Sequence, residues 1–261
     1  MPDRFRDVEP YLERIRYEGP RDPTAGTLRT LHRAHLLAVP FENLDIHLGH
    51  RIGVELDGYY EKVVRDRRGG FCYELNGVFA WLLRALGFEV TLLSARVHDG
   101  KRFGPDFDHL TLRVDLGEPW LADVGFGDSF VEPLRLADSL EQEQEGHRYR
   151  LARAGEEWTL SRQGPGAKEE PQYRFTTTPR RLEEFGPMCE HQQTSPESTF
   201  TRKRVCSLLI PGGRLTLTDG RLVTTRGVER EERTVAGAAE YRSLLEVRFG
   251  IDLAVLPSGW R

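Results

Sequence analysis

The spacing of apolar residues changes at Gly87, and this change most restricts how the chain can fold. Before Gly87 the apolar residues recur every three or four positions, which predicts helices over residues 8–15, 27–40, 59–64 and 72–86. After Gly87 they tend to alternate, which predicts strands over 88–93, 107–115, 120–125, 147–152, 156–162 and 172–177. The chain is therefore expected to form a helical part followed by a β part.

Turn residues mark a smaller third part near the C-terminal end. The residues around Asp219-Gly220 are typical of a hairpin between strands 215–217 and 222–224. A helix is expected over 236–249, although its apolar stripe is imperfect. Between two of the earlier strands, the acidic run of residues 141–145 is expected to form a solvated loop.

The segment 68–76 reads Arg-Gly-Gly-Phe-Cys-Tyr-Glu-Leu-Asn and places Cys72 at the first turn of a predicted helix. Backbone N–H groups in a first helical turn are unpaired and carry partial positive charge, which favours a thiolate over a thiol. Gly69 and Gly70 allow a sharp chain entry beside the sulfur. Cys72 is therefore a candidate nucleophile, and the competing interpretation is a buried cysteine that only packs.

A nucleophilic cysteine needs a base and a group that orients the base. His109 lies in the alternating segment 107–115, and Asp123 lies between apolar residues in the predicted strand 120–125. A buried carboxylate is costly without a partner, and two consecutive antiparallel strands could bring His109 and Asp123 together. We therefore predict a Cys72–His109–Asp123 triad. Taken alone, His109 could be an ordinary strand histidine and Asp123 a turn or capping residue.

Composition and cysteine usage argue against several classes of protein. Acidic and basic residues nearly balance, at 41 and 37 with a net charge of −4, so no nucleic-acid partner is indicated. No apolar run approaches the length of a membrane span, and residues 1–6 lead into no signal-peptide core. The three cysteines are widely spaced, so neither a disulfide framework nor a zinc site is expected, and a cytoplasmic location is the simplest. His32 and His35 lack an evident third metal ligand and are expected at the surface or in helix packing.

The segments around Cys72, His109 and Asp123 resemble those of the arylamine N-acetyltransferases. The family motif Arg-Gly-Gly-aromatic-Cys-aromatic-Glu-x-Asn is matched over 68–76, and the family's Asp-Val-Gly-Phe-Gly segment is matched over 123–127. His109 matches the histidine of the family's second motif. Weaker similarities extend over most of the chain, including residues 39–44 and 191–200.

The resemblance implies an α+β fold in three parts. These are a helical bundle with the nucleophile (residues 1–87), a β-barrel domain with the histidine and aspartate (88–205), and an α/β lid (206–261). The triad would resemble that of a cysteine protease and lie where the first two parts meet. The implied activity is ping-pong transfer of an acetyl group, through acetyl-Cys72, from acetyl-CoA to the nitrogen of an arylamine, arylhydrazine or N-hydroxyarylamine. Acetyl-CoA is then a co-substrate, and no bound cofactor is expected.

Further site residues also follow from the resemblance. The acceptor pocket is expected at Phe41, Phe126 and Phe200, CoA contacts at Gly104, Gly125 and Phe126, and a supporting pair beneath the site at Arg68 and Glu42. Each phenylalanine could instead pack in the core. The implied partners are small molecules, and the oligomeric state is not predicted.

Three other functions stay open on the sequence. A macrolactam-forming amide synthase of the same family has the same triad and would differ in pocket and lid. A thiol hydrolase or transglutaminase uses the same order of cysteine, histidine and aspartate, although segment 68–74 argues against it. A binding protein with a decayed fold is the non-enzymatic alternative, against which an intact triad speaks.

Overall fold

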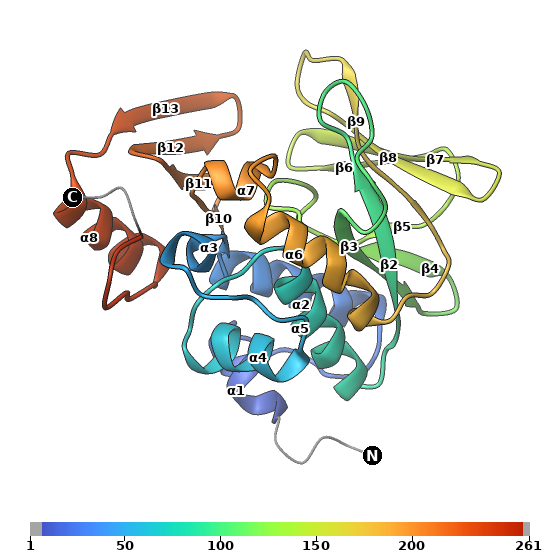
Figure 1. The fold of residues 1–261 in the computed structure, drawn as a ribbon. Helices are drawn as coiled ribbons and strands as arrows, with labels where there is room; N and C mark the ends of the chain where they lie inside the picture. The colour runs from blue at the N-terminus through green and yellow to red at the C-terminus, as the bar shows by residue number, and fades with distance from the viewer. Residues whose placement is uncertain (1–6, 258–261) are drawn as a thin grey trace.

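The computed structural model describes residues 7–257, so the segment on which the signal-peptide prediction rests lies outside the described residues. The fold is mixed, with helices packed against two antiparallel sheets (Figure 1). The N-terminal part contains α1 (Val8–Arg14), α2 (Ala25–Ala38), the short strand β1 (Phe41–Glu42), α3 (Leu44–Leu48), α4 (Leu56–Tyr60), a π-helical turn (Glu61–Arg65) and α5 (Cys72–Ala85).

The larger sheet has eight strands in the order β5-β4-β3-β2-β9-β8-β7-β6 and curls into a nearly closed barrel. Its strands are β2 (Glu89–Val97), β3 (His109–Asp115), β4 (Pro119–Ala122), β5 (Leu134–Arg135), β6 (Leu140–Gln144), β7 (His147–Ala154), β8 (Glu157–Gln163) and β9 (Glu169–Thr176). The order leaves β5 and β6 at the two edges, which face each other across a seam.

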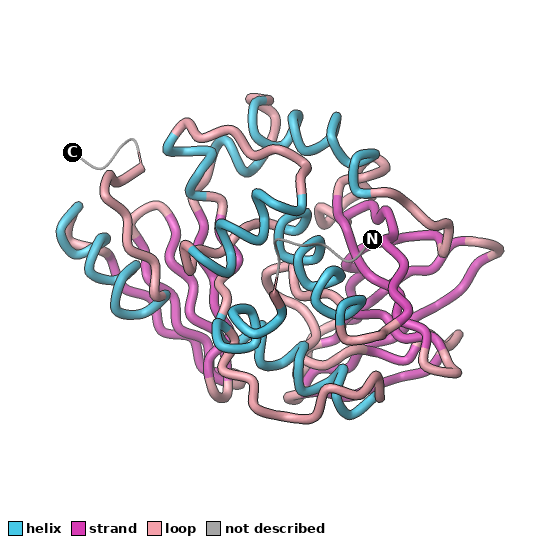
Figure 2. The backbone as a smooth tube through the Cα atoms, turned by 90° about the horizontal axis from the view of Figure 1, so that it is seen from below, coloured by secondary structure: helices cyan, strands magenta, loops and turns pink. Residues whose placement is uncertain are grey.

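The smaller, C-terminal sheet has the order β1-β10-β11-β12-β13, so strand β1 from the N-terminal part closes one edge of it. The barrel is connected to this sheet by a 3₁₀ turn (Leu182–Phe185), α6 (Gly186–Thr194) and α7 (Thr199–Arg202). The other strands of the sheet are β10 (Val205–Ile210), β11 (Gly213–Thr218), β12 (Arg221–Arg226) and β13 (Glu229–Thr234). Helix α8 (Ala238–Phe249) follows them. Seen from below, the helices of the N-terminal part lie between the two sheets (Figure 2).

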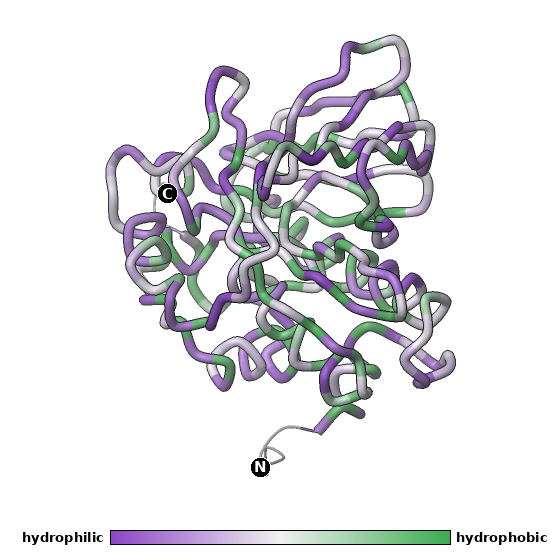
Figure 3. Tube along the Cα trace, turned by 90° about the vertical axis from the view of Figure 1, so that its right-hand side faces the viewer, coloured by the Kyte–Doolittle hydropathy of each residue, from purple (hydrophilic) through white to green (hydrophobic). Residues whose placement is uncertain are grey.

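Three apolar cores hold these layers together. The first combines residues of α1, α2 and α5 with residues of β3 and β4, and also includes Phe185 and Cys189 near α6. The second joins α8 to the C-terminal sheet, and the third fills the barrel. Hydrophobic stretches accordingly run through the middle of the molecule in Figure 3. The first core contains residues from both sides of Gly87, so it spans the predicted boundary between the helical part and the β part. The division of the chain into three domains at residues 87 and 205 therefore stays a prediction.

The predicted helices and strands are confirmed apart from shifts at their ends, and the C-terminal hairpin and helix are present as β11, β12 and α8. None of the helices within residues 7–257 combines the length and apolar character needed to cross a membrane.

The prediction of a loop over residues 141–145 is wrong, because Leu140–Gln144 forms the edge strand β6. Polar residues alone suggested a loop, but their alternation has the period of two that a strand requires. Glu141 and Glu143 are exposed, whereas Gln142 and Gln144 on the other face are half-buried. The half-buried glutamines therefore explain why this segment forms a strand and not a loop.

The two glutamines of β6 hold the seam of the barrel together. The side-chain oxygen of Gln144 accepts hydrogen bonds from the N–H groups of Val131 (3.0 Å) and Glu132 (2.9 Å), and its amide nitrogen donates to the carbonyl of Glu132 (2.8 Å). Gln142 makes a similar pair of bonds with the backbone of Arg135 on β5. Side-chain amides thus replace a backbone ladder where the sheet nearly closes.

This seam yields a prediction about stability. Gln144→Ala leaves two backbone N–H groups and a carbonyl without their partner and should lower the free energy of unfolding by about 2 kcal/mol. Glu143→Ala, on the outer face of the same strand, is the matched control and should change it by less than about 0.5 kcal/mol. Urea unfolding of the three proteins checks this. Equal losses in both variants would show that the amides do not close the barrel.

Candidate active site

Cys72 is the first residue of α5, and the turn before it has no room for side chains on its two glycines. A Cβ at Gly69 would lie 2.0 Å from the carbonyl oxygen of Pro40, and one at Gly70 would lie 2.7 Å from a carboxylate oxygen of Glu74. Glu74 also accepts a backbone hydrogen bond at the start of α5 (3.1 Å). Close packing of backbone therefore fixes where α5 begins, and with it where Cys72 lies.

The two other predicted triad residues are in contact. His109 is the first residue of β3, and Asp123 follows the last residue of β4, so the predicted strand 120–125 is too long at its end. His109 Nε2 lies 2.6 Å from Asp123 Oδ2, and both side chains are buried. Because the chain leaves the sheet at Asp123, its carboxylate is free to reach a histidine that is not directly opposite in the strand register.

Asn76 ties the segments that carry these residues to one another. It lies one helical turn after Cys72, on the same face of α5. Its Nδ2 donates to the carboxylate of Asp123 (2.8 Å) and to the carbonyl of Leu110 (2.7 Å), and its Oδ1 accepts from the N–H of Val124 (2.9 Å). Sequence analysis placed Asn76 in the motif without a role, and its spacing of four residues from Cys72 was the available signal.

His32 on α2 holds the backbone of the same segment. Its Nε2 lies 3.1 Å from the amide nitrogen of Asp123, and its Nδ1 lies 3.0 Å from the carbonyl oxygen of Val131. Since the amide must donate, Nε2 is the acceptor and Nδ1 carries the proton of a neutral imidazole. Burial lowers the pKa of His32 to about 4. His35 is also fully buried on this helix, so of the two predicted alternatives, the surface or helix packing, the structure confirms helix packing.

The Asp123 carboxylate is ionised although it is buried. Burial alone would raise its pKa, but His109 together with hydrogen bonds from Asn76 and from the N–H of Gly125 (3.0 Å) holds the pKa below its ordinary value. Gly125 also brings this segment against α5, because a Cβ there would lie 2.8 Å from the Cα of Cys72. The Asp123 carboxylate is thus held in its ionised state and in a defined position.

The Cys72 thiol differs from the prediction made from its helix-start position. Burial raises its pKa well above the ordinary value, and a backbone hydrogen bond from Leu110 opposes only part of that rise. Burial therefore acts against the thiolate that the helix-start position favours. Since Asp123 holds Nε2 of His109, the other ring nitrogen, Nδ1, is the one left to exchange a proton with a neighbouring group.

A cluster of buried charges lies beneath the turn that carries Cys72. Arg68 contacts Glu42 at 2.8 Å and Asp45 at 3.0 Å, while Lys62 contacts Asp45 at 2.7 Å and Glu74 at 2.8 Å. Arg68 and Glu42 are therefore ion-paired, and their supporting role stays a prediction. Burial raises the pKa of Glu74 to about 7 in spite of Lys62. The cluster links β1 and α3 to the beginning of α5.

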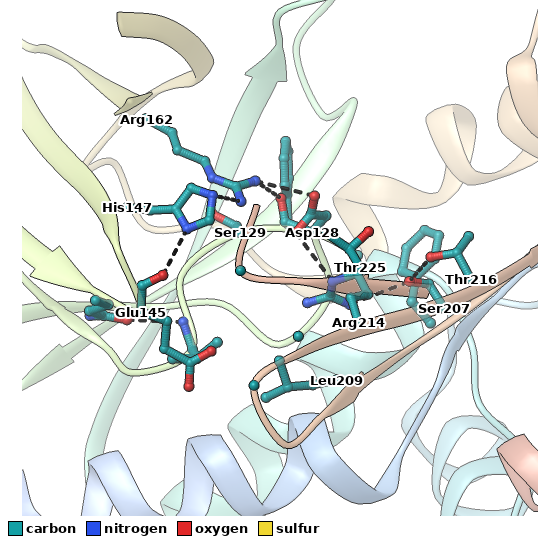
Figure 4. Close-up of a pocket in the computed structure, with 18 of the residues that line it drawn as sticks. Asp128, Ser129, Glu145, His147, Arg162, Ser207, Leu209, Arg214, Thr216 and Thr225 are labelled. Atoms are coloured by element: carbon teal, nitrogen blue, oxygen red, sulfur yellow. Dashed lines mark hydrogen bonds and ion pairs between the residues drawn. The ribbon is translucent and has the colours of Figure 1, made fainter. Parts of the chain in front are cut away.

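A cavity of about 700 Å³ lies between the barrel and the C-terminal sheet (Figure 4). Phe41 and Phe126 both line it. The ring of Phe126 has its centroid 5.2 Å from that of His109, so the cavity begins next to the histidine. Its lining does not include Cys72 or His109 themselves.

The other predicted pocket residues are not part of this lining. Phe200 packs against Phe41 and Phe71, with ring centroids 6.1 Å and 5.8 Å away. Gly104 lies at the end of the hairpin after β2, where a Cβ would meet the carboxylate of Asp108 at 2.6 Å. Gly125 contacts the backbone of Cys72. The structure therefore brings Phe41 and Phe126 to the cavity and leaves the other three outside it.

A barrel-and-helix fold with a buried cysteine at a helix start and a His–Asp pair beside it can be compared with known proteins. A family model described as N-acetyltransferase matches residues 24–256, which is most of the chain. Among curated proteins, the chain is 32% identical to the arylamine N-acetyltransferase pineal gland isozyme NAT-3 of Gallus gallus, over 95% of this chain and 94% of that protein. It is 36% identical to arylamine N-acetyltransferase 1 of Homo sapiens, over 79% of each chain.

Solved structures agree with the sequence comparisons. The arylamine N-acetyltransferase of Salmonella typhimurium superposes with a TM-score of 0.89 at 32% identity, covering 97% of this chain and 94% of that one. The Mycobacterium marinum enzyme in complex with CoA superposes with a TM-score of 0.87 at 31% identity, covering 94% and 93%. The chain belongs to the arylamine N-acetyltransferase family and is an acyltransferase.

The buried His32 generates a prediction about pH. His32→Gln keeps one donor and one acceptor but removes the titrating ring. Unfolding of the wild type releases a histidine of ordinary pKa 6.5 from a site where it is about 4, so stability is lost as pH falls from 6.5 toward 4. In that window the free energy of unfolding of the variant should fall less steeply, by about 1 kcal/mol per pH unit.

Urea unfolding at several pH values measures this slope, with His191→Gln on the exposed face of α6 as the control that should keep the wild-type slope. An unchanged slope in His32→Gln would mean that His32 is already charged in the folded protein.

Proposed function

We propose that the chain transfers an acetyl group from acetyl-CoA to the nitrogen of an arylamine, arylhydrazine or N-hydroxyarylamine through an acetyl-cysteine on Cys72. The observation that carries this proposal is the buried 2.6 Å contact of His109 with Asp123, held against the first turn of α5 by Asn76. Family membership and the CoA complex of the Mycobacterium marinum relative support the donor. The N-terminal helices, the barrel and the C-terminal sheet would act as bundle, barrel and lid.

In the first half-reaction the Cys72 sulfur attacks the thioester carbonyl. His109 takes the thiol proton at Nδ1, and Asp123 stabilises the resulting imidazolium through Nε2. Unpaired N–H groups at the start of α5 are the candidate donors to the oxyanion of the tetrahedral intermediate. The intermediate collapses when the bond to the CoA sulfur breaks and the proton on His109 passes to that sulfur. Cys72 then carries the acetyl group.

In the second half-reaction the acceptor nitrogen attacks the acetyl carbon on Cys72. His109 removes a proton from the nitrogen as the new amide bond forms, and returns it to the cysteine sulfur when the C–S bond breaks. Burial of Cys72 serves this step, because water that reached the thioester would hydrolyse it. The first half-reaction gives the thiol proton of Cys72 to CoA, and the second returns a proton from the acceptor nitrogen to the cysteine sulfur, so that one full cycle restores the protein.

The acetyl-enzyme is the direct test of this proposal. Protein mixed with acetyl-CoA and no amine should gain the mass of one acetyl group and release one equivalent of CoA thiol, and Cys72→Ala should do neither. Subsequent addition of an arylamine should remove the adduct and yield the N-acetyl product. Intact-protein mass spectrometry with a thiol assay follows both events. An adduct on Cys189 or Cys206, or one that persists in Cys72→Ala, contradicts the assignment.

The role of His109 can be tested without acetyl transfer. Burial keeps the Cys72 thiol protonated unless His109 accepts its proton, so His109→Ala should shift the pH profile of iodoacetamide alkylation at Cys72 to higher pH. Asp123→Asn should shift it in the same direction, because the amide cannot stabilise the imidazolium. Alkylation is followed at Cys72 by peptide mass spectrometry. Superimposable profiles for wild type and His109→Ala would remove His109 from the mechanism.

A further inference from the structure

The wall of the cavity carries charged residues that the proposed chemistry does not use. Arg162 on β8 and Arg214 on β11 both contact the carboxylate of Asp128, each at 3.2 Å (Figure 4). The two guanidinium groups therefore come from different sheets and meet at one carboxylate. Their side chains are only 21% and 13% exposed, whereas that of Asp128 is 62% accessible. The two arginines are thus largely buried in the cavity wall and are not free surface charges.

The charges of this wall do not cancel. Two arginines face one carboxylate, which leaves one positive charge in excess. His147 adds none, since burial and Arg162 lower its pKa, and its Nε2 lies 2.7 Å from Arg162. Glu145 also lines the cavity, but its carboxylate is paired at 2.6 Å with Arg33 outside it.

A guanidinium pair in a partly enclosed cavity selects for carboxylates. Arginine presents several N–H donors in a planar fork, and hydrogen bonds between ionised partners are stronger than neutral ones. Arg214 uses Nε for Asp128 and reaches Ser207 with Nη1 at 3.4 Å, which leaves Nη2 for a ligand. Phe41 and Phe126 line the same cavity, so apolar rings and cationic groups share one space.

We propose that the acceptor site has a carboxylate-binding end formed by Arg162 and Arg214, and that it favours aromatic amines or hydrazines that carry a carboxylate. The aromatic ring would lie against Phe41 and Phe126, with its nitrogen toward Cys72 and its carboxylate toward the arginines. Asp128 is the built-in counter-ion that limits how strongly an anion binds. This inference rests on the proposed acetyl transfer, since it names the acceptor class of the same site.

The alternative is that the arginines only join the barrel to the C-terminal sheet through Asp128. Arginines with only this structural role would affect the reactions of all acceptors alike, because loss of either ion pair would disturb the cavity as a whole. A carboxylate site affects only acceptors that carry the charge. The two roles are therefore distinguished by the ratio of kcat/KM for an acceptor with a carboxylate to kcat/KM for an uncharged acceptor, and not by either value alone.

The experiment compares 4-aminobenzoate with 4-aminobenzamide, which has the same ring and amino group but no charge. In Arg162→Gln and Arg214→Gln, the ratio of kcat/KM for the acid over the amide should fall by about tenfold or more, the loss expected for a charge-assisted hydrogen bond. In Asp128→Asn the ratio should rise, because the competing carboxylate is gone. Arg150→Gln is the matched control on β7, where Arg150 pairs with Glu169 on the exposed outside, and should keep the wild-type ratio.

Binding to Cys72→Ala separates this inference from the proposed function. Isothermal titration should give tighter binding of the acid than of the amide, and Arg214→Gln in the same background should abolish that difference. If acid and amide bind as expected but no acetyl is transferred, the acetyl-transfer proposal fails and the carboxylate site stands. If transfer proceeds but both arginine variants keep the wild-type ratio, or lower both reactions equally, the carboxylate site is overturned.

Discussion

The structure depends on a carboxylate that water does not reach. An ionised Asp123 would cost several kcal/mol in an apolar interior if it were unpaired, so folding must deliver its partners together. These partners come from separate parts of the chain: His109 from the barrel, Asn76 from α5, and the N–H of Gly125 from its own segment. His32 on α2 fixes the backbone beneath it. The helices and the barrel are thereby joined at a residue that neither could bury alone.

The same burial changes how the cysteine must be activated. At an exposed helix start the dipole would lower the thiol pKa, but Cys72 is enclosed, and burial raises the pKa of its thiol. In the proposed mechanism a thiolate forms as one half of an ion pair, when the proton moves to His109. Asp123 makes that transfer possible because it is already charged.

Local patterns in the sequence sufficed for the helical and strand segments, and for the contact between His109 and Asp123, because the first depend on spacing within a few residues and the second on two consecutive strands. They did not suffice where long-range contacts decide. The buried neutral state of His32 depends on a backbone about ninety residues away, and the charges of Arg162 and Arg214 meet only because two sheets pack together. Strand β6 was missed for the same reason, since its glutamines have no partner until the barrel curls.

Two buried groups near the site respond to pH in opposite directions. The pKa of Glu74 is raised from 4.5 to about 7, so it contributes stability at low pH that is lost as pH rises through this range. The pKa of His32 is lowered from 6.5 to about 4, so it contributes stability at high pH that is lost as pH falls. Between about 4.5 and 6.5 the contributions of these two groups have slopes of opposite sign, so each opposes the other. The start of α5 and the backbone of Asp123 are therefore held by groups whose effects on the pH dependence of stability oppose each other.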